Sequence, residues 1–210
     1  MRYRFILFDL DGTLVDSYDP LVSTINETLE AHKLPLLSSL DLQEGLYKIY
    51  HKRAHLADPK TLRETHLKLQ HKHLHRATLY SHVLETLQRL RDSGVHMAVV
   101  TTCNIAKAKL LMSTHGLDPF FKVIITEADV ANIKPHKEPF EKATKALGAK
   151  NLDEVLMVGD GIPDIEGAHG YGIHVAAVTY SAFGIRVRDY KPTYTIDRFD
   201  ELLPIIGIHS

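Results

Sequence analysis

From about residue 80 to the end of the chain, short apolar runs alternate with segments that carry apolar residues at helical spacing. The segment 83–92 is one such helix, and Gly94 stands where a helix commonly ends. The apolar runs predict strands at 96–100, 122–126, 155–158, 174–178 and 194–196. Strands that alternate with helices form βαβ units, which build a parallel sheet covered on both faces. We therefore expect an α/β fold with a doubly wound parallel sheet.

Capping and stop signals place the helices between these strands. Asn104 is suited to cap a helix that runs to about His115, with Gly116 as its stop. Pro139 fits the first turn of another helix, which ends before Gly148. A short helix is expected at 165–168.

The interval 17–79 breaks this rhythm. It contains no convincing strand, and 21–29, 40–50 and 62–74 have helical patterns. We expect a core domain made of 1–16 and 80–210, with a small all-α cap domain, 17–79, inserted after the first strand.

Composition excludes several classes of protein. The 210 residues include 25 basic and 26 acidic side chains, so the net charge of -1 gives no general reason to expect nucleic-acid binding. The single cysteine, Cys103, rules out an intramolecular disulfide and fits a reducing compartment. No stretch reaches about 18 apolar residues, and the first residues do not resemble a signal peptide. The expectation is a cytoplasmic monomer or homodimer without a membrane or nucleic-acid partner.

Two carboxylates follow the first predicted strand, the apolar run 5–8, at once. Asp9 and Asp11 come directly after it, and Gly12 allows a sharp turn. Ligands of open α/β sheets bind beyond the carboxyl ends of the strands. Neighbouring carboxylates repel each other, and Mg²⁺, which prefers oxygen ligands, relieves that repulsion. Taken alone, the pair is equally compatible with turn or capping residues.

Four segments carry a more specific signal. The string FDLDGTLVDS at 8–17 resembles the first motif of the haloacid dehalogenase superfamily. The segments 99–102, 134–135 and 158–164 resemble its second, third and fourth motifs, in the family's order and each after a predicted strand. The resemblance, closest to phosphoglycolate phosphatase-like members with a helical cap, implies a Rossmann-like core.

The resemblance implies a role for each acidic residue. Asp9 would attack phosphorus and become a phosphoaspartate, while Asp11 would act as general acid and then as general base. Mg²⁺ would be held by Asp9, by Asp11 through its backbone carbonyl, and by Asp160. Asp164 would be a further ligand or would orient metal-bound water, although it could instead cap the helix that follows. Because dehalogenases lack the second aspartate, Asp11 argues against dehalogenation.

The resemblance also implies a phosphate pocket. Thr101 matches the hydroxyl that binds the transferring phosphoryl group, and Thr102 stands where phosphoglycolate phosphatases commonly have Asn. Lys134 would neutralise charge that develops in the transition state. We prefer Lys134 to Lys137 for this role because the prolines at 135 and 139 set the register of the motif.

The inserted segment resembles a cap that closes over the site as a lid. Gly45 matches a loop that reaches the site in relatives, and Tyr47, Lys48 and Arg53 are candidate substrate contacts. The alternative for these side chains is a solvated basic helix face.

Three functions remain open on the sequence. The first is a phosphoric monoester hydrolase that acts on a small phosphorylated metabolite such as phosphoglycolate, a sugar phosphate, a nucleotide or pyrophosphate. The second is a phosphomutase of the β-phosphoglucomutase type, which must protect its phosphoaspartate from water. The third is a non-catalytic protein that binds a phosphorylated ligand. The complete set of motifs argues against the third.

Overall fold

The chain divides into two compact units, one made of Met1–Asp16 with Thr78–Ser210 and the other of Ser17–Ala77. The computed structural model describes residues 1–38, 41, 49–182 and 184–208. No helix within these ranges has the length and apolar character that crossing a membrane requires.

A parallel sheet of six strands forms the centre of the first unit, in the order β5-β4-β1-β6-β7-β8. Its central strand, β1, pairs with β4 on one side and with β6 on the other. The chain moves outward from β1 through β4 to β5 and then returns to the other side of β1, so the strand order reverses there. The strands are β1 Phe5–Phe8, β4 His96–Val100, β5 Val123–Ile125, β6 Val155–Gly159, β7 His174–Val178 and β8 Tyr194–Ile196.

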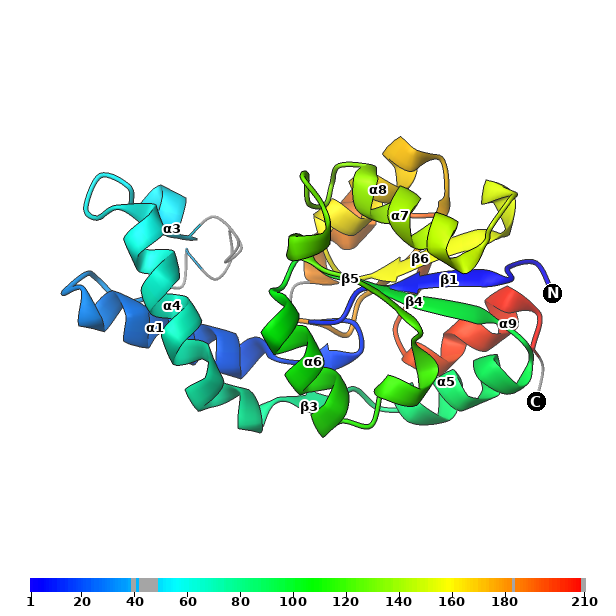
Figure 1. Cartoon of the computed structure of the whole chain (residues 1–210), viewed down its shortest axis with the longest axis horizontal. Helices are drawn as coiled ribbons and strands as arrows, with labels where there is room; N and C mark the ends of the chain where they lie inside the picture. The colour runs from blue at the N-terminus through cyan, green and yellow to red at the C-terminus, as the bar shows by residue number, and fades with distance from the viewer. Residues whose placement is uncertain (39–40, 42–48, 183, 209–210) are drawn as a thin grey trace. The chain divides into compact units, whose positions relative to one another are not determined.

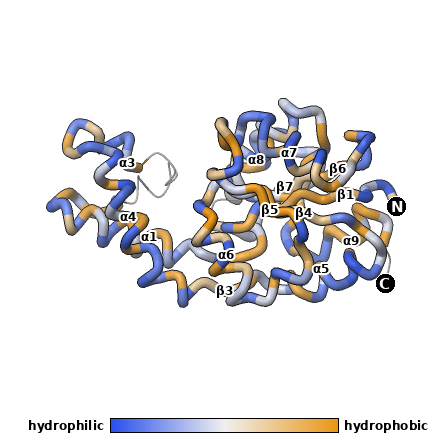
Figure 2. Tube along the Cα trace, in the orientation of Figure 1, coloured by the Kyte–Doolittle hydropathy of each residue, from blue (hydrophilic) through white to orange (hydrophobic). Residues whose placement is uncertain are grey.

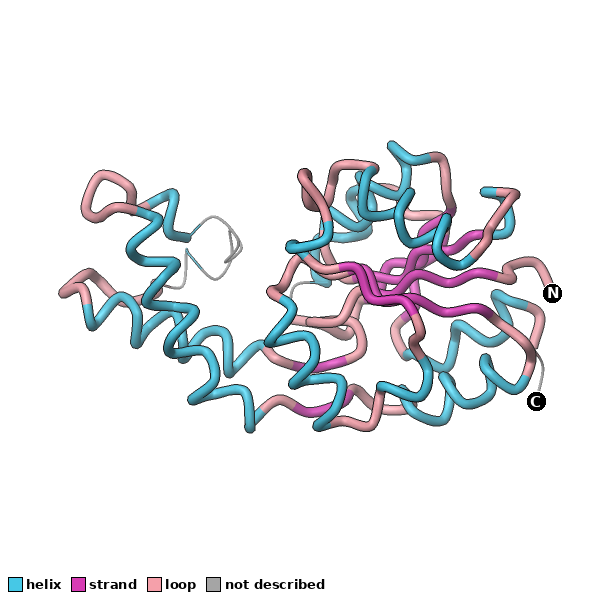
Figure 3. Tube along the Cα trace, viewed as in Figure 1, coloured by secondary structure: helices cyan, strands magenta, loops and turns pink. Residues whose placement is uncertain are grey.

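Helices cover both faces of this sheet (Figures 1 and 3). One face carries α7 (Glu138–Leu147) and α8 (Ile162–Tyr171), and the opposite face carries α5 (Val83–Asp92), α6 (Ile105–Thr114) and α9 (Leu202–Ile206). This arrangement confirms the doubly wound α/β fold.

The central strands β1 and β6 are hydrophobic along their length because both of their faces are buried (Figure 2). Phe5 and Leu7 join a cluster that includes Phe140 of α7 and Ile165 of α8. On the other face, the ring of Phe8 lies 5.8 Å from that of Phe121 between centroids. With packing on both faces, β1 ends in a fixed position, which fixes the residues that follow it.

The second unit is helical, with α1 (Tyr18–Ala31) packed against α4 (Pro59–His73). It also contains α3 (Ile49–Lys52) and a 3-10 helix, Leu74–Arg76. Asp58 caps α4, since its side chain accepts the backbone N–H groups of Lys60 and Thr61. The contacts between these two helices include a hydrogen bond between Glu27 of α1 and His73 of α4, with 2.7 Å between Oε2 and Nε2.

The expectation that 17–79 contains no strand is wrong. Val15–Asp16 (β2) and Thr78–Leu79 (β3) form an antiparallel ribbon in which Val15 pairs with Leu79. Each strand has two residues, too few to show an alternating pattern, and the partners lie far apart in the sequence. The helix expected at 165–168 is also longer and begins at Ile162, where Pro163 fits the first turn.

Candidate active site

Three carboxylates meet beyond the carboxyl ends of β1 and β6. One oxygen from each of Asp9, Asp160 and Asp164 lies within 4.8 Å of the others. Asp9 follows β1 and its backbone N–H donates to the carbonyl of Val158, which joins the ends of the two strands. Asp160 directly follows β6, and Asp164 lies in the first turn of α8. The sheet therefore brings together residues that are about 150 positions apart in the sequence.

Lys134 supplies the positive charge in this cluster. Its Nζ lies 3.0 Å from Asp9 Oδ1 and 2.6 Å from Asp164 Oδ1. It also donates to the carbonyl oxygen of Val100, at the end of β4, over 2.8 Å. The ammonium group is thus held from three elements, while Lys137 is exposed.

Gly12 leaves room for the cluster. Its φ is +78°, which favours glycine, and a Cβ at this position would lie 2.1 Å from Asp160 Oδ2. The loop after β1 can therefore approach Asp160 only because residue 12 has no side chain.

Hydroxyl groups orient Asp160. Ser181 Oγ donates to Asp160 Oδ2 over 2.6 Å, and Thr13 Oγ1 donates to Asp160 Oδ1 over 3.3 Å. Tyr180 donates to the backbone carbonyl of Thr13 over 2.7 Å, so the segment after β7 supports the loop after β1. Sequence reasoning missed Ser181 and Tyr180. Their position after the strand at 174–178, at the same sheet edge as the motifs, was the available signal.

Asp164 has two roles at once. Its Oδ2 accepts the backbone N–H of Gly161 over 3.0 Å, which caps the start of α8. Its Oδ1 accepts from Lys134. The capping interpretation and the site interpretation of this residue are therefore compatible.

Burial and mutual repulsion dominate the electrostatics of the cluster. Burial, partly offset by Lys134 and reinforced by the charge of Asp164, raises the pKa of Asp9 to about 7. Burial and repulsion from Asp9 and Asp164 also raise the pKa of Asp160. Burial alone would lower the pKa of Lys134, but attraction by Asp164 and Asp9 outweighs it and leaves that pKa above its usual value. The cluster thus carries more negative charge than one ammonium group compensates.

This donor set fits a divalent cation. Carboxylate oxygens are the ligands that Mg²⁺ prefers, and a cation would offset the repulsion that raises the pKa values of Asp9 and Asp160.

Asp11 is held apart from these three carboxylates by a second lysine. Lys107 Nζ lies 2.7 Å from Asp11 Oδ1, and the two side chains are 13% and 24% exposed. Lys107 belongs to the first turn of α6, and sequence reasoning missed it because none of the four motifs contains it. A positive charge near a helix N-terminus interacts unfavourably with the helix dipole. A lysine at this position was therefore the available sequence signal for a compensating acidic partner.

The two candidate phosphate-binding threonines differ in their surroundings. Thr101 follows β4, is buried, and its hydroxyl accepts the backbone N–H of Cys103 over 3.2 Å. Thr102 is exposed, and its side chain forms no hydrogen bond within the described chain. Burial raises the pKa of the Cys103 thiol to about 12, which marks it as an unreactive neighbour.

The cap residues proposed from sequence are only partly described. Gly45, Tyr47 and Lys48 lie outside the described residues. Arg53 is buried and binds Asp41 within the helical unit, with 2.9 Å between Nη2 and Oδ2. The guanidinium group lowers the pKa of Asp41.

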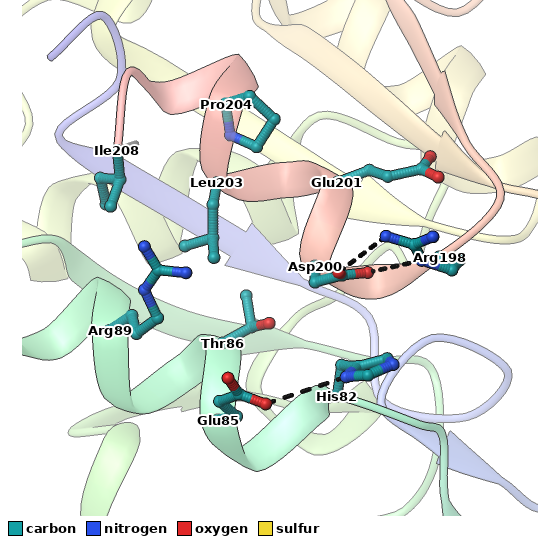
Figure 4. A pocket seen from close by; sticks show the side chains of 10 residues that line it. All are labelled: His82, Glu85, Thr86, Arg89, Arg198, Asp200, Glu201, Leu203, Pro204 and Ile208. Atoms are coloured by element: carbon teal, nitrogen blue, oxygen red, sulfur yellow. Dashed lines mark hydrogen bonds and ion pairs between the residues drawn. The ribbon is translucent and has the colours of Figure 1, made fainter. Parts of the chain in front are cut away.

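A separate pocket of about 280 Å³ lies between α5 and the C-terminal segment, and Figure 4 shows its lining. Two pairs of polar side chains lie within its lining, because Arg198 binds Asp200 at 2.9 Å and His82 lies 3.8 Å from Glu85. None of the four motifs contributes to it. The carboxylate cluster is therefore the candidate active site.

A Rossmann-like core with acidic residues at the ends of β1 and β6 defines a class of hydrolases. Residues 6–178 match the model of the haloacid dehalogenase-like hydrolases, and the chain belongs to this family. The resemblance seen in the four motifs is thereby confirmed.

The chain is also similar to individual proteins of known name or structure. The chain is 36% identical over 217 residues to pyrophosphatase PpaX of Halalkalibacterium halodurans, covering 100% of both chains. It is 34% identical to pyrophosphatase PpaX of Bacillus cereus, covering 99% of this chain and 98% of that one. Among solved structures, a protein described as a predicted phosphoglycolate phosphatase from Haemophilus somnus superposes with a TM-score of 0.86 at 29% identity, covering 98% of each chain.

Proposed function

We propose that this protein is a Mg²⁺-dependent phosphatase that hydrolyses small phosphorylated metabolites through a phosphoaspartate on Asp9. The observation that carries the proposal is the convergence of Asp9, Asp160 and Asp164 around the ammonium group of Lys134. Phosphoryl transfer depends mainly on positioning and on charge stabilisation, and this arrangement provides both.

In the first step, a carboxylate oxygen of Asp9 attacks phosphorus and the bond to the leaving oxygen breaks. Asp11 donates a proton to that oxygen. Lys134 stabilises the charge that develops on the phosphoryl oxygens, and the hydroxyl of Thr101 binds one of them. Mg²⁺, held by Asp9, Asp160 and the backbone carbonyl of Asp11, would neutralise phosphate charge as a Lewis acid.

In the second step, water attacks the phosphorus of the phosphoaspartate. Asp11 accepts a proton from that water, and the bond between phosphorus and Asp9 breaks to release inorganic phosphate. Ser181 and Thr13 keep the carboxylate of Asp160 in place throughout. Asp164 holds Lys134 beside the reacting group.

Phosphoric anhydrides belong in the proposed substrate range beside monoesters. Two relatives at 34–36% identity are named pyrophosphatases, and a solved structure at 29% identity is described as a phosphoglycolate phosphatase. We propose pyrophosphate and small phosphate monoesters as the classes to test first.

The helical unit Ser17–Ala77 is proposed to be a cap that excludes bulk water from the reaction. What supports this role is its place in the chain, since it follows the nucleophile segment and precedes α5.

The experiment is a hydrolysis screen over pyrophosphate, phosphoglycolate, sugar phosphates and nucleotides, with Mg²⁺ and with EDTA. We expect turnover only with Mg²⁺. The Asp9→Asn variant should lose at least about three orders of magnitude in kcat while keeping its circular dichroism spectrum, because only the nucleophile is removed. Near-normal activity in Asp9→Asn, or turnover in EDTA, would contradict the proposal. Dependence on a bisphosphate activator would instead identify a mutase.

A further inference from the structure

Lys107 is a largely buried cation that has no role in the proposed mechanism. It lies in the first turn of α6, where a positive charge is opposed by the helix dipole. Its side chain is only 13% exposed, so it has also lost most of its contact with water. Both effects work against a lysine at this position, so a partner has to compensate for them.

That partner is Asp11. The distance of 2.7 Å between Lys107 Nζ and Asp11 Oδ1 is that of a charge-assisted hydrogen bond. The backbone of Lys107 is fixed as well, because its N–H donates to the capping side chain of Asn104 over 2.9 Å. An anchored lysine therefore reaches from α6 to the loop after β1.

The two lysines of the site divide its aspartates between them. Lys134 contacts Asp9 and Asp164, whereas Lys107 contacts Asp11. General acid–base catalysis requires the carboxyl group to stay within hydrogen-bond reach of the reacting oxygen.

We propose that Lys107 is a positioning residue, which holds the Asp11 carboxyl group in the orientation from which it transfers protons in both steps. This inference rests on the proposed function. In the first step the proton passes from Asp11 to the leaving oxygen as the P–O bond breaks. In the second it returns to Asp11 from the attacking water as the bond to Asp9 breaks.

The test uses leaving groups that differ in their need for a proton. p-Nitrophenolate leaves without protonation, so a misplaced Asp11 spares the first step with p-nitrophenyl phosphate but slows hydrolysis of the phosphoaspartate. The Lys107→Met variant should therefore show a burst of about one nitrophenolate per enzyme. Its steady-state rate of nitrophenolate release should then be about 30-fold lower than that of the unmodified protein. With an alkyl phosphate, kcat should fall without accumulation of phosphoenzyme, and KM should stay within about threefold for both substrates.

Three further variants complete the experiment. Lys109→Met removes an exposed lysine from the same helix and should behave as the unmodified protein. Lys107→Arg keeps the charge and should recover most of the rate of phosphoenzyme hydrolysis. In an Asp11→Asn background, Lys107→Met should slow phosphoenzyme hydrolysis no further, because the partner through which it acts is gone. If Lys107→Met does not fold, Lys107→Gln replaces it in every comparison.

A loss of equal size in the Asp11→Asn background would overturn the inference, as would a change confined to KM or the absence of a burst. Failure of the proposed function gives a different result. In that case the unmodified protein itself shows no Mg²⁺-dependent release of nitrophenolate, or Asp9→Asn remains active.

Discussion

At the scale of single residues, the site contains two kinds of side chain. Asp9, Lys134 and Asp160 could be selected from the sequence because motifs contain them. Ser181 and Lys107 lie outside the motifs and had only weak signals, which are a place after a strand for Ser181 and an unfavourable charge at a helix start for Lys107. The contacts that give them a role in the site appear only in the structure. Contacts between residues 21 or 96 positions apart leave no periodic pattern in a single sequence.

Ser181 should affect metal binding more than folding. Its hydroxyl donates to Asp160 Oδ2, so Ser181→Ala leaves the carboxylate that we propose as a metal ligand less well oriented. We expect the concentration of Mg²⁺ that gives half-maximal activity to rise about tenfold, as is typical when a group that orients a ligand is lost. Titration of activity with MgCl₂ measures this. Ser113→Ala, at an exposed position of α6, should leave the titration unchanged. An unchanged midpoint for Ser181→Ala would show that Asp160 needs no such support.

The carboxylate cluster should destabilise the metal-free protein as the pH rises. Because the pKa of Asp9 is about 7 in the folded chain and near 3.8 when unfolded, the folded state binds more protons between these values. Ionising Asp9 in the fold therefore lowers the free energy of unfolding across that pH window, by at most about 1.4 kcal/mol per pH unit. The neutral Asp9→Asn variant lacks this loss.

Urea unfolding in EDTA at pH 5, 6 and 7 measures the effect as a difference between the two proteins, which cancels the titration of the histidines. Asp9→Asn should gain stability over the unmodified protein as the pH rises. Saturating Mg²⁺ should reduce this gain, since it stabilises the ionised cluster. If the difference in the free energy of unfolding between the two proteins is constant with pH, folding does not raise the pKa of Asp9.

At the scale of elements, the sequence predicts the strands best. The expected strands at 96–100, 174–178 and 194–196 coincide with β4, β7 and β8. Buried parallel strands are continuous apolar runs with polar ends, so their limits are visible. The two-residue strands β2 and β3 offer no comparable signal, and neither does the first turn of α8, where apolar spacing has not yet begun.

Because α8 packs closely against α7, alanine substitutions at two glycines of α8 should change the stability of the protein in opposite directions. A Cβ at Gly167 would lie 2.4 Å from Phe140 Cε2 and 3.0 Å from the carbonyl oxygen of Pro135. Gly167→Ala should therefore destabilise the protein by about 1–3 kcal/mol, despite the better helix propensity of alanine. A Cβ at Gly170 would meet no other part of the described chain within 4 Å, so Gly170→Ala should stabilise the protein by up to about 1 kcal/mol.

Urea midpoints of the two alanine variants provide the comparison. Equal shifts of the urea midpoint for Gly167→Ala and Gly170→Ala would mean that the Phe140 ring can move aside at little energetic cost. Because Lys134 precedes this contact by only a few residues, Gly167→Ala is also expected to reduce kcat.

At the scale of the whole molecule, the fold class and the family can be predicted from the sequence because several motifs each follow a predicted strand. In a parallel sheet these motifs meet at the same edge. Each motif alone is compatible with turn or capping residues. The strands that precede them lie side by side in the order β5-β4-β1-β6, and this adjacency brings the carboxylates and Lys134 together. The sequence supplies that order only through the family resemblance, since pairing between distant strands has no local signal.

The ribbon of β2 and β3 has a consequence for how such a chain can change over time. Val15 pairs with Leu79 and Asp16 with Thr78, so the chain departs from the sheet domain and re-enters it at neighbouring points. Any segment inserted between β2 and β3 therefore begins and ends at neighbouring positions. Insertions, deletions or exchange of the intervening segment can therefore be accommodated without a change in the path of any strand of the six-stranded sheet.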